Sequence, residues 1–345
     1  MKKKWKRVSL VTAIVVSLIL TGCGKQSANQ KQATEDSQYK YGTVEIPCLD
    51  GALCGAPLYV AYENGYFKEE GIDAKLIAAD TETRKIGLNN GTYPITNGDF
   101  MFFQSIEQGV ETTVVDGLHN GCIKILVKNG SNVKQASDLK GKKIGVDEIG
   151  GPPYEAASIW LEAGGVSAKE KDGEITFLPY SDGNLQLEAL YSGEVDAVAI
   201  WDPLASAAVK SGKAVAICDL LDNPVFAGKF CCFVYASNKV LKEKPDEVAA
   251  LLRAIHKAEQ WINDNPEKTV QIVADGNYSE IEDTNLAVEL LKEYVYPTEE
   301  EIAANTHDVE ADVSYFAEQL NRVGYLTTDP DTLIKKLYTK VDISK

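Results

Sequence analysis

The sequence lacks the short motifs that mark most catalytic and nucleotide-binding sites. Its 345 residues contain no P-loop, G-x-S-x-G elbow, H-E-x-x-H pair or EF-hand loop. Histidine is scarce, and of His119, His256 and His307 only His119 lies between glycines just after an expected strand. These absences argue against metal-dependent hydrolases and nucleotide-dependent enzymes. We therefore expect a binding function, with no catalytic residue and no cofactor.

Positive charge is also in short supply. The chain has 35 lysines and arginines against 51 aspartates and glutamates, a net charge of −16. Five of the basic residues lie within residues 1–22, which hold no acidic residue, so the remainder is more acidic than the whole. Such a balance excludes nucleic acid as a partner and opposes electrostatic attachment to an anionic lipid surface.

Zinc-type cysteine spacing is absent, and no metal site is expected. One of the seven cysteines, Cys23, follows the N-terminal apolar run. An even number of the others remains, which in an exported protein permits up to three disulfides in 15 possible pairings. We expect buried structural thiols instead, because a chain of this length has core enough without disulfides. These six cysteines are Cys48, Cys54, Cys122, Cys218, Cys231 and Cys232.

One apolar run stands out, at residues 8–20, and it is shorter than the ~20 residues that cross a bilayer. Basic residues precede it, and Leu20-Thr21-Gly22-Cys23 follows, an order that resembles the lipobox of bacterial lipoproteins. The pattern predicts a signal peptide over residues 1–22, lipid on Cys23, and a polar flexible linker over residues 23–41. An ordinary secreted protein with a chance cysteine is the alternative.

Beyond the linker, short branched runs alternate with helical patterns, which predicts an α/β protein with parallel sheets. A single helix is expected over residues 58–70, and residues from 245 onward read as mostly helical. Two of the expected strands end beside polar side chains: residues 95–97 precede Asp99, and residues 197–200 precede Trp201.

Four stretches resemble the nitrate/sulfonate/taurine and NMT1/THI5-like substrate-binding proteins. They lie in the family's order between residue 44 and the mid-260s. Each is weakly specific alone, and the four together are fairly specific. The stretches are GAPLYVAYENGYFKEEGI from Gly55, DLKGKKIGV from Asp138, LYSGEVDAVAIWDP from Leu190, and SNKVL from Ser237.

The resemblance implies a type II periplasmic-binding-protein fold, in which two α/β lobes close on a ligand. Lobe one is expected over residues 42–124 and 231–345, including a helical C-terminal extension, and lobe two over residues 125–230. The resemblance further implies a lipid-anchored monomer on the extracytoplasmic face of the cell membrane. Its expected partners are a small solute and the permease and ATPase subunits of an ABC importer.

On such a fold, the ligand lies against loops at the carboxyl ends of strands and against helix N-termini. Glycines before a helix usually offer N–H groups to an anion, but Pro152 and Pro153 remove two donors and Glu155 adds negative charge. This departure favours a nitrogen-bearing or aromatic solute, such as a pyrimidine, over a sulfonate or nitrate. The expected ligand contacts are Asp50, Asp99, His119, Gly150, Gly151, Tyr154, Tyr180, Trp201 and Asp202.

Two other functions stay open. The THI5-like branch includes pyrimidine synthases with a cysteine-rich stretch, which Phe230-Cys231-Cys232-Phe233 resembles. This chain has only two adjacent cysteines there and carries an export signal, both of which disfavour the enzyme. A surface lipoprotein without a transport role is the other alternative.

Overall fold

The computed structural model describes residues 38–48, 53–279, 281–294, 296–297, 301 and 308–344. Residues 38–345 form one compact unit. The predicted signal peptide, Cys23 and Asp50 lie outside the described residues, as does most of the predicted linker. Among the helices that are described, none has the length and apolar character needed to cross a membrane.

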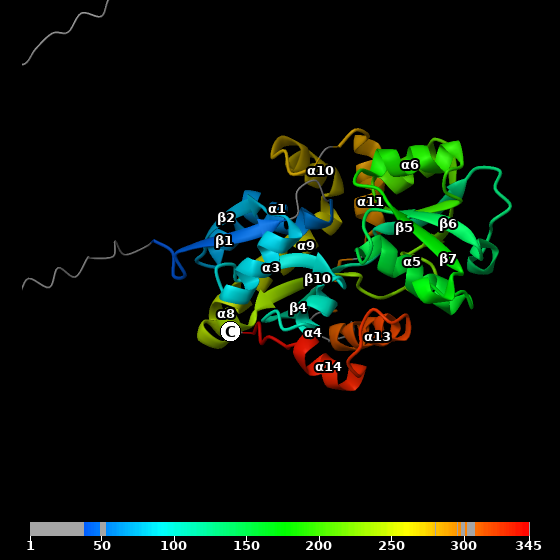
Figure 1. The fold of residues 1–345 in the computed structure, drawn as a ribbon. Helices are drawn as coiled ribbons and strands as arrows, with labels where there is room; N and C mark the ends of the chain where they lie inside the picture. Colours follow the sequence, from blue (N-terminus) through cyan, green and yellow to red (C-terminus); the bar gives the residue numbers. More distant parts are fainter. Residues whose placement is uncertain are drawn as a thin grey trace, which may run out of the picture. The chain divides into compact units, whose positions relative to one another are not determined.

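Strands and helices alternate along most of the described chain (Figure 1). Two small sheets, ordered β1-β2 and β3-β10-β4, belong to the part that we call lobe one. A five-stranded sheet, ordered β7-β6-β8-β5-β9, belongs to lobe two. The strands of lobe one are β1 (Thr43–Cys48), β2 (Asp73–Ala78), β3 (Ile95–Asp99), β4 (Thr112–His119) and β10 (Cys232–Ser237). Those of lobe two are β5 (Ile123–Lys128), β6 (Lys142–Val146), β7 (Ile175–Pro179), β8 (Ala197–Trp201) and β9 (Ala214–Asp219).

The α/β class is confirmed, but the prediction of parallel sheets is only partly right. β1 and β2 are parallel, and β6 is parallel to both β7 and β8. In contrast, β10 is antiparallel to β3 and β4, and β5 is antiparallel to β8 and β9. The residue pattern of a buried strand reports its burial and not its direction, which explains the error.

Helices cover both faces of the lobe-two sheet (Figure 1). Along β8, Ala197 and Ala199 belong to the same core as α5, whereas Val198 and Ile200 pack in a second core with α6 and α7. Alternate residues of a strand point to opposite faces, so this short apolar run contributes to two cores at once. The α-helices of lobe two are α5 (Pro152–Ala163), α6 (Gly183–Ser192) and α7 (Leu204–Lys210), and η2 (Ala136–Leu139) and η3 (Glu170–Asp172) are short 3-10 helices.

The single helix expected over residues 58–70 is two helices, α1 (Ala56–Glu63) and α2 (Tyr66–Glu69). Between them, Gly65 has φ +78°, a left-handed conformation that ends a helix and that glycine adopts without strain. The remaining helices of lobe one before β10 are η1 (Leu53–Gly55), α3 (Thr81–Asn90) and α4 (Phe102–Glu107).

The prediction of a mostly helical C-terminal region is confirmed. The long helix α9 packs against α1 and α2, while α13 contacts α14, β4 and also α5 of lobe two. Described helices of this region are α8 (Asn238–Glu243), α9 (Pro245–Asp264), α10 (Pro266–Asp275), α11 (Thr284–Glu293), α13 (Val309–Arg322) and α14 (Pro330–Leu337). The predicted lobe boundaries at residues 124 and 230 stay a prediction.

Candidate functional site

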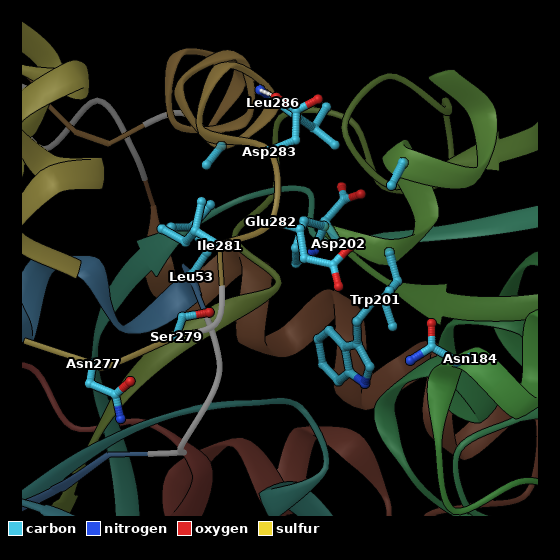
Figure 2. Close-up of a pocket in the computed structure, with 14 residues that line it drawn as sticks. Leu53, Asn184, Trp201, Asp202, Asn277, Ser279, Ile281, Glu282, Asp283 and Leu286 are labelled. Atoms are coloured by element: carbon cyan, nitrogen blue, oxygen red, sulfur yellow. Dashed lines mark hydrogen bonds between the residues drawn. The ribbon is translucent and has the colours of Figure 1, made fainter. Parts of the chain in front are cut away.

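A cavity of about 540 Å³ lies where β8 ends, between lobe two and the C-terminal helices (Figure 2). Trp201 and Asp202 line it from lobe two, and Leu53 lines it from lobe one. Another wall comes from residues around α11, among them Ser279, Glu282 and Asp283. A cavity of this size accommodates a small organic molecule.

Trp201 is the last residue of β8, and its indole is held in place by a hydrogen bond. The Nε1–H group donates to Asp147 Oδ2 at 3.0 Å, just after β6. Because this bond fixes the ring while its side chain stays partly exposed, the indole can offer a face to a bound molecule.

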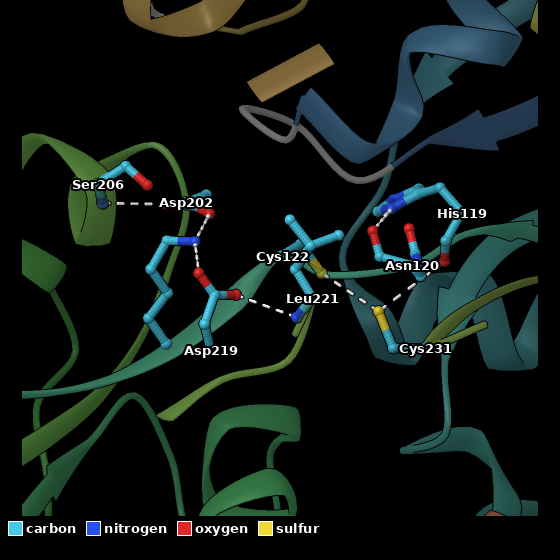
Figure 3. A network of polar contacts seen from close by, with 9 residues as sticks. His119, Asn120, Cys122, Asp202, Ser206, Asp219, Leu221 and Cys231 are labelled. Carbon is cyan, nitrogen blue, oxygen red and sulfur yellow. Dashed lines mark hydrogen bonds and ion pairs between the residues drawn. The ribbon is translucent and has the colours of Figure 1, made fainter. Parts of the chain in front are cut away.

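Asp202 follows Trp201 and is buried. Its Oδ1 accepts from the Ser206 N–H at 3.0 Å, and its Oδ2 lies 3.3 Å from Lys124 Nζ. Lys124 also pairs with Asp219 (Figure 3). Burial raises the pKa of Asp202, and the Lys124 ammonium opposes that rise. Asp202 therefore forms the negative end of a buried ion pair at the cavity wall.

The cavity wall carries negative charge. Asp202, Glu282 and Asp283 are among its lining residues, and within the described part of the chain no lysine or arginine lines it. Lys210 lies nearby, where its Nζ pairs with Asp283 Oδ2 at 3.1 Å and links α7 to the start of α11. Such a wall suits a solute with N–H donors or positive charge better than an anion.

A second acidic group lies where β3 and α5 approach each other. Asp99 ends β3, Glu155 occupies the first turn of α5, and Asp147 follows β6. Burial raises the pKa of all three carboxyls, and for Glu155 the charge of Asp99 adds to the rise. We call these three residues the carboxyl cluster. It brings carboxyl groups from both lobes together in a weakly solvated setting.

Asp99 makes a specific pH prediction. Burial raises its pKa to about 8, against about 4 for an exposed aspartate. Between these values the folded chain keeps a proton that the unfolded chain loses, so this carboxyl makes the free energy of unfolding decrease as pH rises. Asp99→Asn should reduce that decrease. Between pH 5 and pH 8, the free energy of unfolding of the variant should rise by more than about 1 kcal/mol relative to that of wild type. Urea unfolding at the two pH values measures the difference.

The exposed Asp222 supplies the control for this experiment. Asp222→Asn should leave the pH dependence of unfolding as it is in wild type. Parallel pH profiles for Asp99→Asn and wild type would contradict the buried, proton-holding carboxyl.

None of the other predicted ligand contacts that the structure describes lines the cavity at Trp201. Gly150 and Tyr154 line a different cavity, of about 570 Å³, together with Tyr325, whose hydroxyl donates to Gly150 O at 2.8 Å. Gly151 precedes α5, and prolines occupy the first two positions of that helix. Tyr180 donates its hydroxyl to Glu194 at 3.1 Å and packs with the second core of lobe two.

His119 is fully buried and does not line the cavity at Trp201. It lies among cysteine thiols. Burial opposes its protonation, yet Cys54, Cys231 and the Asn120 carbonyl together outweigh that effect and raise the pKa of the imidazole to about 9. Hydrogen bonds from the Cys122 and Cys232 thiols hold the pKa of Cys54 well below its usual range. The structure thus brings Trp201 and Asp202 into one cavity, with Asp99 and His119 buried elsewhere.

Neither Asp147 nor the cavity wall around α11 was among the contacts predicted from the sequence. Asp147 follows a predicted strand, so its position at a strand end was the available signal. The residues near Asp283 lie in a helical region, and their place at the cavity depends on tertiary contacts such as the ion pair with Lys210. The six cysteines outside the N-terminal region are buried free thiols, as expected.

The two lobes and their sheets define the fold class of the protein. The fold is that of periplasmic binding proteins, and it is similar to the alkanesulfonate-binding protein SsuA of Xanthomonas axonopodis pv. citri, with a TM-score of 0.65 and 16% identity over 86% of this chain and 98% of that one. Residues 55–269 match the family model described as NMT1/THI5 like. The chain belongs to this family, as the four sequence stretches predict.

Named relatives include binding proteins. A binding protein of Brucella abortus (strain 2308) is 29% identical over 179 residues, and this match covers 51% of the chain and 52% of the relative. The chain thus spans about half the length of that relative. A formylaminopyrimidine-binding protein of Halalkalibacterium halodurans is 27% identical over 84% of the chain and 86% of the relative. A Bacillus subtilis (strain 168) protein named for aliphatic sulfonates is 26% identical over 77% of each.

The fold also occurs in an enzyme. The desulfurization enzyme DszB is similar to this chain, with a TM-score of 0.58 and 17% identity over 86% of the chain and 96% of the enzyme. The fold alone therefore does not separate binding from catalysis.

Proposed function

We propose that the chain is an extracytoplasmic solute-binding lipoprotein that captures a small nitrogen-bearing solute in the cavity at Trp201. The observation that carries the proposal is the cavity itself, in which an oriented indole and three acidic side chains are found together with no lysine or arginine among the described lining residues. An aromatic face together with hydrogen-bond acceptors matches a flat heterocycle with N–H donors, such as a pyrimidine.

The first turn of α5 belongs to a different cavity, the one lined by Gly150 and Tyr154, and it too is poorly suited to an anion. Pro152 and Pro153 lack N–H groups, and the Gly151 N–H lies 3.3 Å from the Glu148 carbonyl oxygen. Glu155 is a buried carboxyl whose pKa is raised by burial, so it supplies no positive charge to an anion at this helix end. A sulfonate or nitrate would therefore find few hydrogen-bond donors at the start of α5. The relative named for formylaminopyrimidine agrees with the proposed solute better than the relative named for aliphatic sulfonates.

In this proposal the mature chain remains tethered by lipid on Cys23 and passes its solute, as a monomer, to the permease and ATPase of an ABC importer. Cys23→Ala should remove the site of lipid attachment, so the protein should appear in the medium or remain as uncut precursor. Membrane fractionation and immunoblotting measure the distribution. Equal retention of wild type and variant in washed membranes would refute the anchor.

Asp202→Asn reports the charge of the solute. For a solute with N–H donors or positive charge, losing the carboxylate should weaken binding by roughly ten- to a hundredfold, because a charge-assisted hydrogen bond contributes about 1.5–3 kcal/mol. For an anion, the same change should leave binding equal or tighter. Asp219→Asn is the matched control, since Asp219 shares Lys124 but does not line the cavity. Titration calorimetry with the solute measures the affinity of both variants.

We also propose that the solute leaves unchanged. Ser279 is the one hydroxyl among the described lining residues, and neither histidine nor lysine accompanies it there as a base. Mass spectrometry of the solute after prolonged incubation with pure protein tests this proposal directly. Recovery of the input mass supports a binding protein, and a time-dependent product would establish the synthase-type enzyme instead.

A further inference from the structure

A cluster of thiols and one imidazole lies buried beside the segments that connect the two lobes. Cys54, His119, Cys122 and Cys232 each offer one ligand atom, and these atoms all lie within 4.8 Å of one another. Each of the four residues is at most 8% exposed. We call them the thiol–imidazole cluster.

The fold gathers the cluster from three separate segments of the sequence. Cys54 belongs to η1, His119 ends β4, and Cys232 begins β10, where it is paired directly with His119. Gly121, with φ +61°, makes the turn that leads from His119 to Cys122. Cys122 also connects the cluster to the cavity, because its carbonyl oxygen accepts from the Asp202 N–H at 2.9 Å.

Within the proposed ligand set, the distance between the Cys122 and Cys232 sulfurs fits a shared metal ion, and Cys231 lies just outside the set. Cys122 Sγ lies 3.6 Å from Cys232 Sγ and 3.7 Å from Cys231 Sγ (Figure 3 shows Cys122 beside Cys231). Two thiolates bound tetrahedrally at about 2.3 Å from one zinc ion are about 3.8 Å apart. A disulfide requires a sulfur–sulfur distance of about 2.05 Å, so these thiols are not bridged, and their spacing matches that of two thiolates on one zinc ion.

His119 is oriented as a metal ligand would be. Its Nδ1 lies 3.0 Å from the Asn120 carbonyl oxygen, an arrangement in which Nδ1–H donates (Figure 3). Its Nε2 is buried and has no hydrogen-bond partner among the described residues. Metal-bound histidines commonly donate their other N–H to a backbone carbonyl, which fixes the ring and leaves the second nitrogen for the metal. An unpartnered buried nitrogen beside three thiols thus points independently to a missing ligand.

Two tyrosines enclose the cluster. Tyr294 stacks on the His119 ring with centroids 4.6 Å apart, and Tyr296 lies edge-on with centroids 6.1 Å apart. Both tyrosines are buried, so little space is left for water around the ring. A closed, four-ligand site of this kind is typical of structural metal sites, which leave no position open for substrate.

We propose that Cys54, His119, Cys122 and Cys232 bind one Zn²⁺ ion and thereby fasten η1 to the β4–β5 and β10 segments that connect the lobes. Three sulfurs and one nitrogen form a soft tetrahedral set that selects zinc over magnesium or calcium, which require oxygen ligands. Binding releases the remaining thiol and imidazole protons to solvent, and no redox step is involved. The site is separate from the proposed solute cavity, so either proposal can fail without the other.

The test uses the full-length chain kept reduced with a phosphine and titrated with Zn²⁺ and, in parallel, with Co²⁺. We expect one equivalent of Zn²⁺ per chain by elemental analysis. We also expect Co²⁺ to give sulfur-to-cobalt charge-transfer absorption and the strong visible bands of a tetrahedral ion. The wild-type Co²⁺ spectrum needs no variant and therefore tests the site even if substitutions impair folding.

Substitutions of the proposed ligands and of control cysteines test where the ion binds. Cys122→Ser and His119→Gln should weaken Zn²⁺ binding by at least roughly ten- to a hundredfold. Cys48→Ser and Cys218→Ser are matched controls, since both cysteines are buried outside the cluster, and they should retain one equivalent. Absence of the cobalt bands, binding unaffected by Cys122→Ser, or a disulfide at Cys122 in protein isolated under native conditions would each overturn the proposal.

Discussion

Replacing Trp201 with alanine is expected to weaken solute binding by roughly ten- to a hundredfold. The indole lines the cavity, and its Nε1–H bond to Asp147 holds the ring in one orientation before the solute arrives. A stacked aromatic face contributes about 1–3 kcal/mol to the binding of a base-like ring, which corresponds to that loss in affinity. Titration calorimetry of wild type and Trp201→Ala with the same solute measures it.

Trp201→Phe separates stacking from the hydrogen bond. Phenylalanine keeps an aromatic face but cannot donate to Asp147, so its binding should lie between that of wild type and that of the alanine variant. Unfolding curves for all three proteins should nearly coincide, because the side chain of Trp201 is only partly buried. If Trp201→Ala binds as tightly as wild type, the indole is structural and the proposed cavity is not the solute site.

Replacing Phe316 with alanine is expected to lower the free energy of unfolding by about 3–5 kcal/mol. Phe316 on α13 is fully buried, and its ring stacks on Phe100 with centroids 4.8 Å apart. It also contacts Phe226 and Phe233, so its removal leaves a cavity bounded by aromatic rings that cannot all move inward. Denaturant unfolding monitored by circular dichroism measures the change.

Phe316→Leu serves as the conservative control and should cost less than about 1.5 kcal/mol, since it restores most of the lost volume. The exposed Ile86 gives a second control, because Ile86→Ala should change stability by no more than about 0.5 kcal/mol. A loss below about 1 kcal/mol for Phe316→Ala would show that α13 contributes little to the core.

The sequence was informative wherever a local pattern determines the structure. The apolar run before Trp201 predicts a strand over residues 197–200, and β8 covers these residues and ends one residue later, at Trp201. Where Gly65 interrupts the predicted first helix, the local signal was present and was outweighed by the apolar pattern on either side. Strand direction could not be obtained in this way, because β5 and β10 pair through contacts between distant segments.

The thiol–imidazole cluster shows the same limit at the level of chemistry. Cys54 and Cys232 are far apart in the sequence, so no spacing motif includes them both. Only the pairing of β10 with β4 brings Cys232 opposite His119. His119 was expected to contact the solute because of its place after a strand, whereas tertiary packing places it among thiols and beneath Tyr294.

Titration calorimetry of the full-length chain with a formylaminopyrimidine and, separately, with an alkanesulfonate tests the central proposal most directly. The proposed function predicts saturable binding of the pyrimidine with one site per chain and no measurable heat from the sulfonate, because the cavity wall carries acidic side chains and, among its described lining residues, no lysine or arginine. Saturable binding of the sulfonate with no binding of the pyrimidine would contradict it.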